Sequence, residues 1–443
     1  MSRTFSTKQI WVIAYPIILS SIAQNILNVT DTIFLGRLGE VALGAGVIGG
    51  LFYNVLLMFG WGMALGGQII IARRLGEKKD VEIGKVHTQL IYGLVVTSLL
   101  LTFLVYIGTR PFLNMAVSSV PIREAGKVFL HYRTWGLLFA FLCYSFNSYY
   151  VGIAKTKVLT IATLIMVSFN VVFDYGLIFG HFGLPKMGIA GAAMASAIAE
   201  VVCTLFLFGY TYFYNDYKHY GLFRFGKLSK QYLSRILNVS VPLMFQFFLS
   251  IFVWLVFFLF IEKMGELPLA ASNIIRSVYI VLMIPIWGFA SATNTIVSQL
   301  IGKGKSDEVI STVRRILTLS VSSVAVLAGI VLIFSSKIIR LYTSNNDIVT
   351  TALPVIPVIA LGAVGMAMAF VLFNAVSGTG NTRTSLLIEV ITLAVYLSYA
   401  YFLAVQVQVR LPWVWTAEIL YGIGVTTASL LYLASKRWLG KQV

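Results

Sequence analysis

Long apolar segments recur along the whole chain, and they constrain its fold more than any other feature of the sequence. Each is about 20 residues long, the length that an α-helix needs to cross a hydrocarbon layer of about 30 Å. The 443 residues are 58% hydrophobic and only 11% charged, whereas soluble domains are about 25% charged. The sequence therefore predicts an all-α polytopic membrane protein.

Segment length predicts about 12 transmembrane helices. Their approximate ranges are 10–35, 43–72, 88–107, 135–154, 159–179, 187–210, 239–261, 270–301, 316–334, 353–376, 385–405 and 414–434. A polar connector at 215–235 separates the sixth helix from the seventh. We expect two six-helix lobes, 1–214 and 236–443, around a central cleft.

The net charge of +17 is concentrated in alternate loops, so it indicates membrane orientation and not nucleic-acid binding. The basic loops contain Arg73, Arg74, Lys78, Lys79, Lys85, Lys155, Lys157, Lys303, Lys305, Arg314, Arg315 and Arg383, together with the connector and the C-terminal tail. Arg110, Arg123, Lys127 and Arg133 are a local exception in a loop of the other set. We expect both termini and the connector in the cytoplasm, and the protein in the inner membrane.

Several classes of protein find no support in the sequence. Cys143 and Cys203 both lie inside apolar segments, which argues against a disulfide framework and a metal cluster. There is no Walker loop, nucleophile elbow or dinucleotide fingerprint. The first apolar segment lacks a small-residue cleavage site and is interpreted as a retained helix. We therefore expect no enzyme and no cofactor, and an ion gradient as the energy source.

The two halves of the sequence form an internal repeat. Pro16 matches Pro242, and the difference between these positions, 226 residues, also relates the other landmarks. These pairs are Leu38–Glu40 with Met264–Glu266, Gly76 with Gly302, and Gly152–Lys157 with Gly378–Arg383. Each half begins on the same side, so the repeat is parallel, with its axis along the membrane normal. This architecture is typical of alternating-access carriers.

Asp31 is the most informative polar residue, because it lies deep in the first apolar segment. Asn25, Asn28 and Asp31 are three residues apart and form one polar stripe on a helix. A carboxylate in mid-membrane costs about 2.5–3.5 kcal/mol on insertion scales, and such residues are functional by default. The repeat places Phe257 at the equivalent position, so the acid is not required by the scaffold.

A second acidic group lies on the fifth predicted helix, where Asn170 and Asp174 are four residues apart and share a face. Their equivalents in the other half are Tyr396 and Ala400. Two close carboxylates repel, and a bound proton or Na⁺ relieves both the repulsion and the cost of burial. We expect a cation site in the first lobe where ion loading displaces an organic cation.

Other polar residues in apolar segments are weaker candidates. Asn25, Asn28 and Asn170 are also explained as interhelical hydrogen-bonding residues. The candidates for the substrate cleft are Asn25, Asn28, Gln68, Asn147 and Arg276, and further intramembrane acids are Glu200, Glu389 and Glu418. Arg276 is a candidate counter-ion for one of these glutamates.

The sequence resembles the MATE (multidrug and toxic compound extrusion) family over nearly its whole length. The resemblance is carried by Tyr15–Gly39, Gly66–Gly76, Asn170–Asp174, Gly188–Ser196 and the turn at Gly378–Thr382. It implies Na⁺- or H⁺-coupled export of amphipathic, mostly cationic compounds. It also implies a cation site that matches Asp31, Asn170 and Asp174, with Ser196 in place of a threonine of relatives. The expected partners are small organic cations or drugs and the lipid bilayer, and we expect a monomer.

Two other functions compete with this interpretation. A flippase for lipid-linked oligosaccharides, from the same superfamily, often has more spans and a basic cavity, whereas Arg276 is the one well-placed intramembrane arginine here. A membrane enzyme or channel subunit is disfavoured by the repeat and by the lack of a catalytic set.

Overall fold

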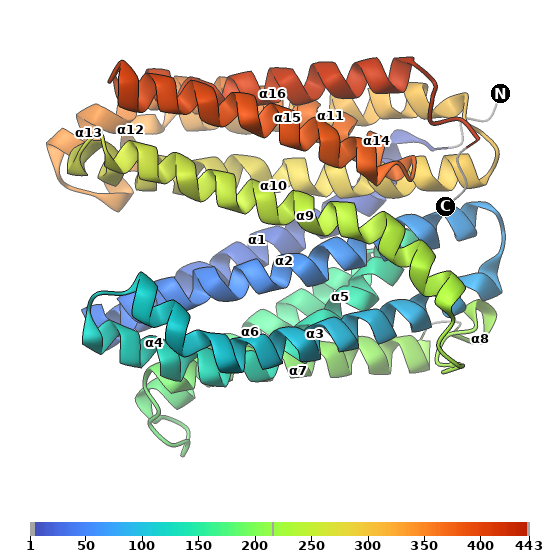
Figure 1. Cartoon of the computed structure of the whole chain (residues 1–443), viewed down its shortest axis with the longest axis horizontal. Helices are drawn as coiled ribbons and strands as arrows, with labels where there is room; N and C mark the ends of the chain where they lie inside the picture. The colour runs from blue at the N-terminus through green and yellow to red at the C-terminus, as the bar shows by residue number, and fades with distance from the viewer. Residues whose placement is uncertain (1–4, 215–216, 441–443) are drawn as a thin grey trace. The chain divides into compact units, whose positions relative to one another are not determined.

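The computed structural model describes residues 5–214 and 217–440, and the regular structure in these ranges is helical (Figure 1). Eleven of the described helices are long and apolar enough to cross a membrane. The remaining predicted span, 135–154, contains α5 (Leu137–Gly152), which follows α4 (Val120–Arg133) through a 3-10 turn, η1 (Thr134–Gly136). The predicted all-α membrane fold is confirmed.

The first half contains α1 (Thr7–Leu38), α2 (Glu40–Gly76), α3 (Asp80–Ala116), α6 (Lys157–Phe179) and α7 (Ile189–Tyr214) besides α4 and α5. Most of these helices extend beyond the apolar ranges expected from the sequence; α3 begins eight residues before position 88, at Asp80. A helix does not end where the hydrocarbon ends, because its backbone hydrogen bonds also form in water. Hydropathy therefore located the spans but not the helix ends.

The second half contains α9 (Lys230–Glu262), α10 (Glu266–Gly302), α11 (Glu308–Ile333), α12 (Ser335–Tyr342), α13 (Asn346–Ala352), η2 (Leu353–Val355), α14 (Ile356–Gly378), α15 (Thr382–Tyr401), η3 (Phe402–Gln406) and α16 (Leu411–Ala434). Within the predicted connector at 215–235, the structure describes a short helix, α8 (Tyr217–Tyr220), and the start of α9. Asn215 and Asp216, the first two residues of that connector, lie outside the described residues.

The helix boundaries confirm the internal repeat. Both ends of α2 and α10 differ by the offset that separates Pro16 from Pro242, and each of these prolines lies inside its helix. Gly39 and Gly265, which precede α2 and α10, have φ angles of 112° and 117°. These values are accessible to glycine and strained for other residues, so the turn geometry is repeated as well as the helices.

The chain divides into two compact units. The N-unit is Leu19–Met244, and the C-unit is formed by the described residues up to Ile18 together with those from Phe245 onward. Ile18 and Met244 are themselves related by the repeat offset. Thus α1 and α9 each begin in one unit and continue into the other, which was not expected from the sequence.

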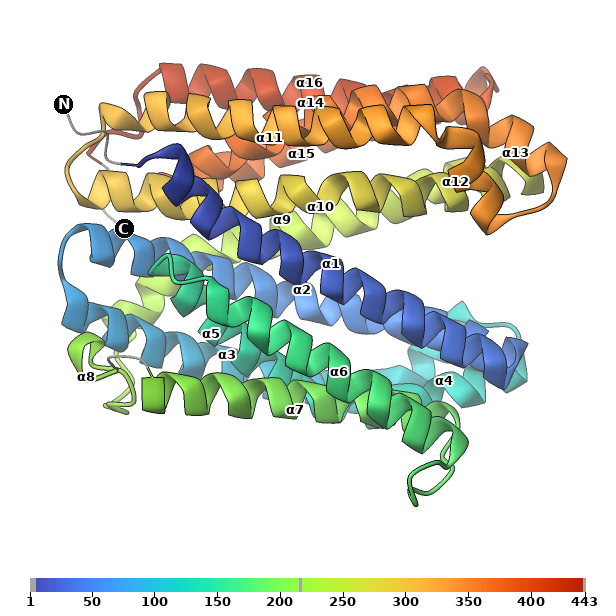
Figure 2. The ribbon, with the colours of Figure 1, turned by 180° about the vertical axis from the view of Figure 1, so that it is seen from behind.

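Each unit holds the first part of the other half's leading helix through a glycine. In the N-unit, a Cβ atom on Gly62 would lie 2.7 Å from the backbone nitrogen of Met244. In the C-unit, the equivalent Gly288 lies against Ile18, and Trp11 packs edge-on against Phe289 at 5.2 Å. The start of α1 is visible beside α10 in Figure 2. Small residues allow such close helix packing in a membrane.

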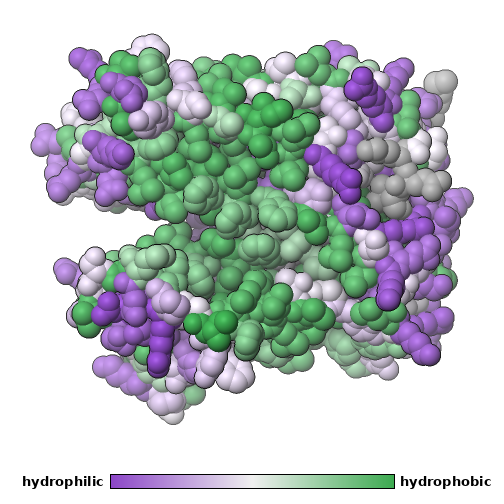
Figure 3. Space-filling view, in the orientation of Figure 1, coloured by the Kyte–Doolittle hydropathy of each residue, from purple (hydrophilic) through white to green (hydrophobic). Residues whose placement is uncertain are grey.

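The surface of each unit agrees with a membrane setting. Hydrophobic residues cover its middle, and hydrophilic residues gather toward both ends (Figure 3). The main core of the C-unit includes Phe257, Tyr279, Tyr396 and Trp415, all nearly inaccessible to solvent.

Candidate cation site in the N-unit

The polar residues predicted on the fifth and sixth spans are brought together by a tight pairing of α6 and α7. Gly191 lies so close to α6 that a Cβ atom there would be 2.5 Å from the carbonyl oxygen of Leu177. The amide of Met187 donates a hydrogen bond of 2.7 Å to that carbonyl. The absence of a side chain at Gly191 therefore sets the separation of the two helices beside the site.

Asp31, Asn170, Asp174 and Ser196 form one cluster, built from α1, α6 and α7. With its nitrogen facing the carboxylates, the Asn170 amide donates to Asp31 Oδ1 at 3.0 Å and to Asp174 Oδ2 at 3.1 Å. Its oxygen then accepts from the Ser196 hydroxyl at 3.2 Å. The opposite orientation would place the amide oxygen against two carboxylate oxygens, so we assign the first on the hydrogen-bonding pattern.

The two carboxyl groups also contact one another. Asp31 and Asp174 are within side-chain hydrogen-bonding distance, a contact that requires a proton or a cation between two groups that otherwise only accept. Asp174 is 1% exposed, and its Oδ1 atom is buried without a hydrogen-bond partner. Asp31 is less deeply buried. The cluster therefore offers one buried carboxylate oxygen that makes no hydrogen bond, next to a second carboxyl group.

An apolar contact closes the cluster toward one end of the same three helices. Leu35, Ile178 and Ala192 pack together, and the rings of Phe34 and Phe179 meet edge-to-face at 5.9 Å. Leu35 follows Asp31 by one helical turn, and Ile178 follows Asp174 by one turn. Water is thereby kept from this side of the carboxyl pair.

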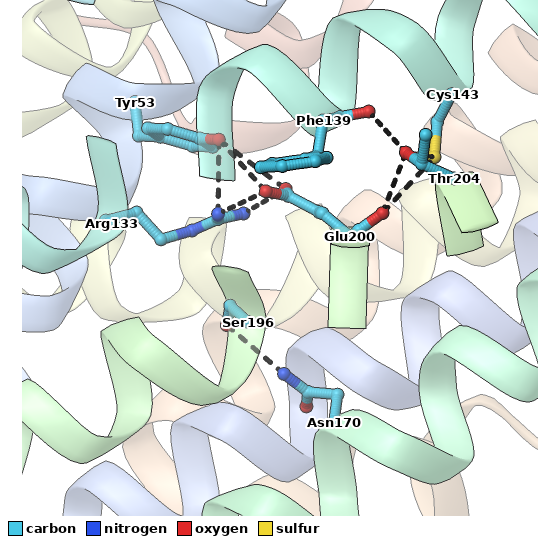
Figure 4. A network of polar contacts seen from close by, with 8 residues as sticks. All are labelled: Tyr53, Arg133, Phe139, Cys143, Asn170, Ser196, Glu200 and Thr204. Carbon is cyan, nitrogen blue, oxygen red and sulfur yellow. Dashed lines mark hydrogen bonds and ion pairs between the residues drawn. The ribbon is translucent and has the colours of Figure 1, made fainter. Parts of the chain in front are cut away.

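A buried ion pair lies next to the cluster, one turn further along α7 from Ser196 (Figure 4). Arg133 binds Glu200 through two hydrogen bonds of 2.6 and 2.8 Å, and it donates a third, of 3.1 Å, to the Tyr53 hydroxyl. The guanidinium also lies 3.9 Å from the centre of the Tyr53 ring. Among the described residues, the salt-bridge partner of Arg133 is Glu200, and neither aspartate forms a salt bridge with it.

This network corrects the sequence analysis, because the counter-ion of Glu200 is Arg133 and not Arg276. Arg276 instead lies over the Phe258 ring at 5.3 Å. The signal for Arg133 was present in the sequence, where it was one of the basic residues that departed from the loop pattern. The ion pair also requires a glycine at position 136, because a Cβ atom there would lie against the Glu200 carboxylate.

The candidates for the substrate cleft are not one cluster. Gln68 and Asn147 line the same small cavity in the N-unit, together with Trp61 and Ser148. Asn25 is half-buried and Asn28 is exposed, and the hydrogen bonds of the aspartate cluster involve neither of them.

The two other intramembrane glutamates lie in the C-unit and are satisfied by hydroxyl groups. Glu418 accepts hydrogen bonds of 2.9 Å from both Tyr279 and Tyr396. Glu389 accepts from Ser250 at 2.5 Å and from Tyr421 at 2.9 and 3.0 Å. Neither has an arginine or lysine partner among the described residues.

Comparison with known proteins identifies the family. The MatE profile matches residues 16–176 and 242–402, two segments separated by the same offset as the structural repeat. The chain belongs to the MatE family. Members of this family are transporters and not enzymes, which agrees with the expectation drawn from the sequence.

Relatives extend this assignment over most of the chain. A probable multidrug resistance protein NorM of Pasteurella multocida is 26% identical over 86% of this chain and 82% of its own. A protein of the same description from Thermotoga maritima is 24% identical over 97% and 93%.

Solved structures share the fold. A multidrug resistance MATE family transporter of the MOP superfamily, in an outward-facing conformation, has a TM-score of 0.86 at 19% identity, covering 97% of this chain and 95% of its own. A mutant of the Vibrio cholerae MATE transporter VcmN has a TM-score of 0.88 at 16% identity, covering 97% and 98%. This MatE protein is therefore a multi-pass efflux-type transporter with the two-lobe MATE fold.

Proposed function

We propose that this MatE protein is a secondary active antiporter that exports amphipathic, mostly cationic compounds in exchange for Na⁺ or H⁺. The observation that carries the proposal is the pair Asp31 and Asp174, in contact within a buried cluster where one oxygen of Asp174 makes no hydrogen bond. The relatives named as probable multidrug resistance proteins support the class of cargo.

The chemistry of the cluster fits the exchange of one small cation. A proton between the two carboxyl groups would make one of them a hydrogen-bond donor to the other. Na⁺ would use the free oxygen of Asp174 together with oxygens of Asp31 and Asn170, which are hard ligands. In both cases Asn170 orients the carboxyl groups, because its amide contacts both of them.

The ion and the organic cargo would compete for the negative charge of Asp31 and Asp174. Without the ion, the aspartates carry uncompensated negative charge that attracts a cationic compound. When the ion binds from outside, this attraction is lost and the compound is released. A ligand shifts a conformational equilibrium only by its different affinities for the two states, and loading or emptying this pair supplies such a difference between inward- and outward-facing states.

The proposed placement is the inner membrane, with both termini and the connector in the cytoplasm. It rests on the basic loops that alternate along the sequence. It orients the apolar contact around Leu35 and Ile178 toward the outside, because the N-terminus of α1 then lies inside.

The proposal is tested by reconstituting the protein in liposomes loaded with a fluorescent organic cation, with Na⁺ and pH gradients imposed separately. One of the two gradients should drive transport, and Asp31→Asn should remove that response while the variant inserts normally. If neither gradient changes transport by the unaltered protein, antiport is wrong. If the variant responds fully, the assigned site is wrong.

A further inference from the structure

A cavity in the N-unit lies away from the aspartate cluster, at the start of α3. It has a volume of about 320 Å³, within the range of small-ligand sites. Residues 221–229, between α8 and α9, form one wall, and the first turns of α3 form another. The transport cycle proposed above uses none of its residues.

The lining of this cavity is strongly basic. Lys85, Arg224 and Lys227 all contribute to it, and no acidic residue does. The nearest acids on α3 are already paired, since Asp80 contacts His219 at 2.8 Å and Glu82 contacts Arg74 at 3.1 Å. The three cations form no ion pair within the described chain, so the cavity has an excess of positive charge.

Hydroxyl groups add hydrogen-bond donors to this charge. Thr88, Ser229 and Tyr232 line the cavity beside the basic residues. Thr88 is 3% exposed, and its hydroxyl makes no hydrogen bond within the described chain although the residue lines the cavity. Cations combined with hydroxyl donors are suited to a phosphate group.

The cavity wall is held in place by specific contacts. The Gln89 side chain donates to the carbonyl of Lys227 at 3.1 Å and accepts from the amide of Ser229 at 2.9 Å. The Tyr92 hydroxyl donates to the carbonyl of Gly226 at 2.9 Å. On the opposite side, a Cβ atom on Gly84 would lie against the Gly221 carbonyl oxygen. The segment is thus docked on α3, and the site is preformed.

Exposed apolar residues next to the cations indicate where the anion comes from. Phe225 and Leu228, which follow Arg224 and Lys227, are 60% and 56% exposed, and Val81 on α3 is 51% exposed. A small soluble anion would make no favourable contact with these apolar side chains, whereas a lipid presents acyl chains beside its phosphate. Basic pockets at the ends of membrane helices are suited to anionic headgroups.

We propose that this cavity binds the phosphate group of an anionic phospholipid such as phosphatidylglycerol. The phosphate would lie among Lys85, Arg224 and Lys227, with Thr88 as a buried donor, and the acyl chains would lie along Phe225 and Leu228. The site would tie the segment between the two halves of the chain to the lipid surface.

The test uses the full-length protein in detergent, delipidated and then titrated with dimyristoyl phosphatidylglycerol, and native mass spectrometry counts the lipid retained. Arg224→Gln/Lys227→Gln should weaken binding by about 30-fold, because each basic residue near an anionic lipid contributes about fivefold. The matched control is Lys436→Gln/Arg437→Gln, which removes the same charge from exposed residues outside the cavity. The control should bind like the unaltered protein.

Two further arms identify the ligand. Phosphatidylcholine tests the need for net negative charge, and sn-glycerol 3-phosphate tests the need for acyl chains. Equal binding of either would overturn the assignment to an anionic lipid. Unchanged retention of phosphatidylglycerol by the cavity variant would overturn the site itself. Neither result bears on the antiport proposal, because the cavity shares no residue with the aspartate cluster.

Discussion

The rings of Phe257 and Tyr396 lie 5.5 Å apart in the buried core of the C-unit. The repeat offset relates these two positions to Asp31 and Asn170, whose side chains also meet. The same junction of helices is therefore an aromatic core in one half and a polar cluster in the other. The polar version is not needed to hold the scaffold together.

Asp31→Asn is expected to abolish export while leaving the amount of protein in the membrane unchanged. The substitution keeps the shape of the side chain but removes its charge, so the pair with Asp174 no longer attracts a cation. Drug resistance in an efflux-deficient host measures the effect, with protein in membranes quantified in parallel. Asp307→Asn, at an exposed position, is the control, and full resistance in the Asp31 variant would refute its role.

Phe257→Ala, at the position equivalent to Asp31, is expected to lower stability and to leave the coupling of transport to the ion intact. Removing this fully buried ring should cost about 3–5 kcal/mol of stability, while the ion dependence of transport should persist. Thermal unfolding in detergent and vesicle transport measure the two effects. Phe103→Ala, at a ring that is 59% exposed, should change neither. Loss of ion dependence without loss of stability would show that the aromatic junction has a coupling role.

Arg133→Gln should destabilise the N-unit by about 3–5 kcal/mol, because it leaves the buried Glu200 without its cation. Arg133→Gln/Glu200→Gln should recover much of this loss, since no charge is then unpaired. Unfolding temperature is the measurement. Lys127→Gln breaks a surface pair with Glu124 and should have no measurable effect. A double variant no better than the single would contradict this account.

Gly62→Ala should be more destabilising than Gly288→Ala, although the two glycines are equivalent in the repeat. The atoms nearest to a new methyl group at Gly62 belong to the Met244 backbone, at 2.7 Å, whereas at Gly288 the nearest atom is in the Ile18 side chain. Side chains adjust more easily than backbone, and overpacking typically costs about 1–3 kcal/mol. Gly50→Ala, where no atom lies within 4 Å, is the control for unfolding measurements. The reverse order of the two variants would contradict the prediction.

Glu77→Gln should lower stability at neutral pH and have less effect in acid. Partial burial acts to raise the pKa of Glu77, but hydrogen bonds from Arg74 and Lys79 outweigh it and hold that pKa below its usual range. A depressed pKa contributes stability above the ordinary pKa of glutamate, and this contribution is lost as the pH falls through the folded-state value. Unfolding temperatures at pH 7 and pH 4 test this, with Glu262→Gln as an exposed control. If Glu77→Gln lowered the unfolding temperature equally at both pH values, the ionisation of Glu77 would not contribute to stability in this way.

The membrane helices and the repeat were predictable, because each depends on patterns within a short stretch of sequence. A helix in hydrocarbon must satisfy its own backbone, so a run of apolar residues is sufficient to locate it. Asp31 and Asp174 were found in the same way, since an acid in such a run is conspicuous. Helix ends were less predictable, and α4, α12 and α13 were not predicted, because hydropathy does not define where a helix ends in water.

The sequence by itself determined the number and order of the spans, their duplication, and which half carries the two buried aspartates. Only the tertiary structure decided which side chains meet. Arg133 and Glu200 pair although they are 67 residues apart in the sequence. No local sequence pattern predicts that α1 and α9 are each divided between the two compact units. The physical reason is that periodicity records which face of a helix is buried, whereas its neighbour is chosen by close packing at residues such as Gly62, Gly136 and Gly191.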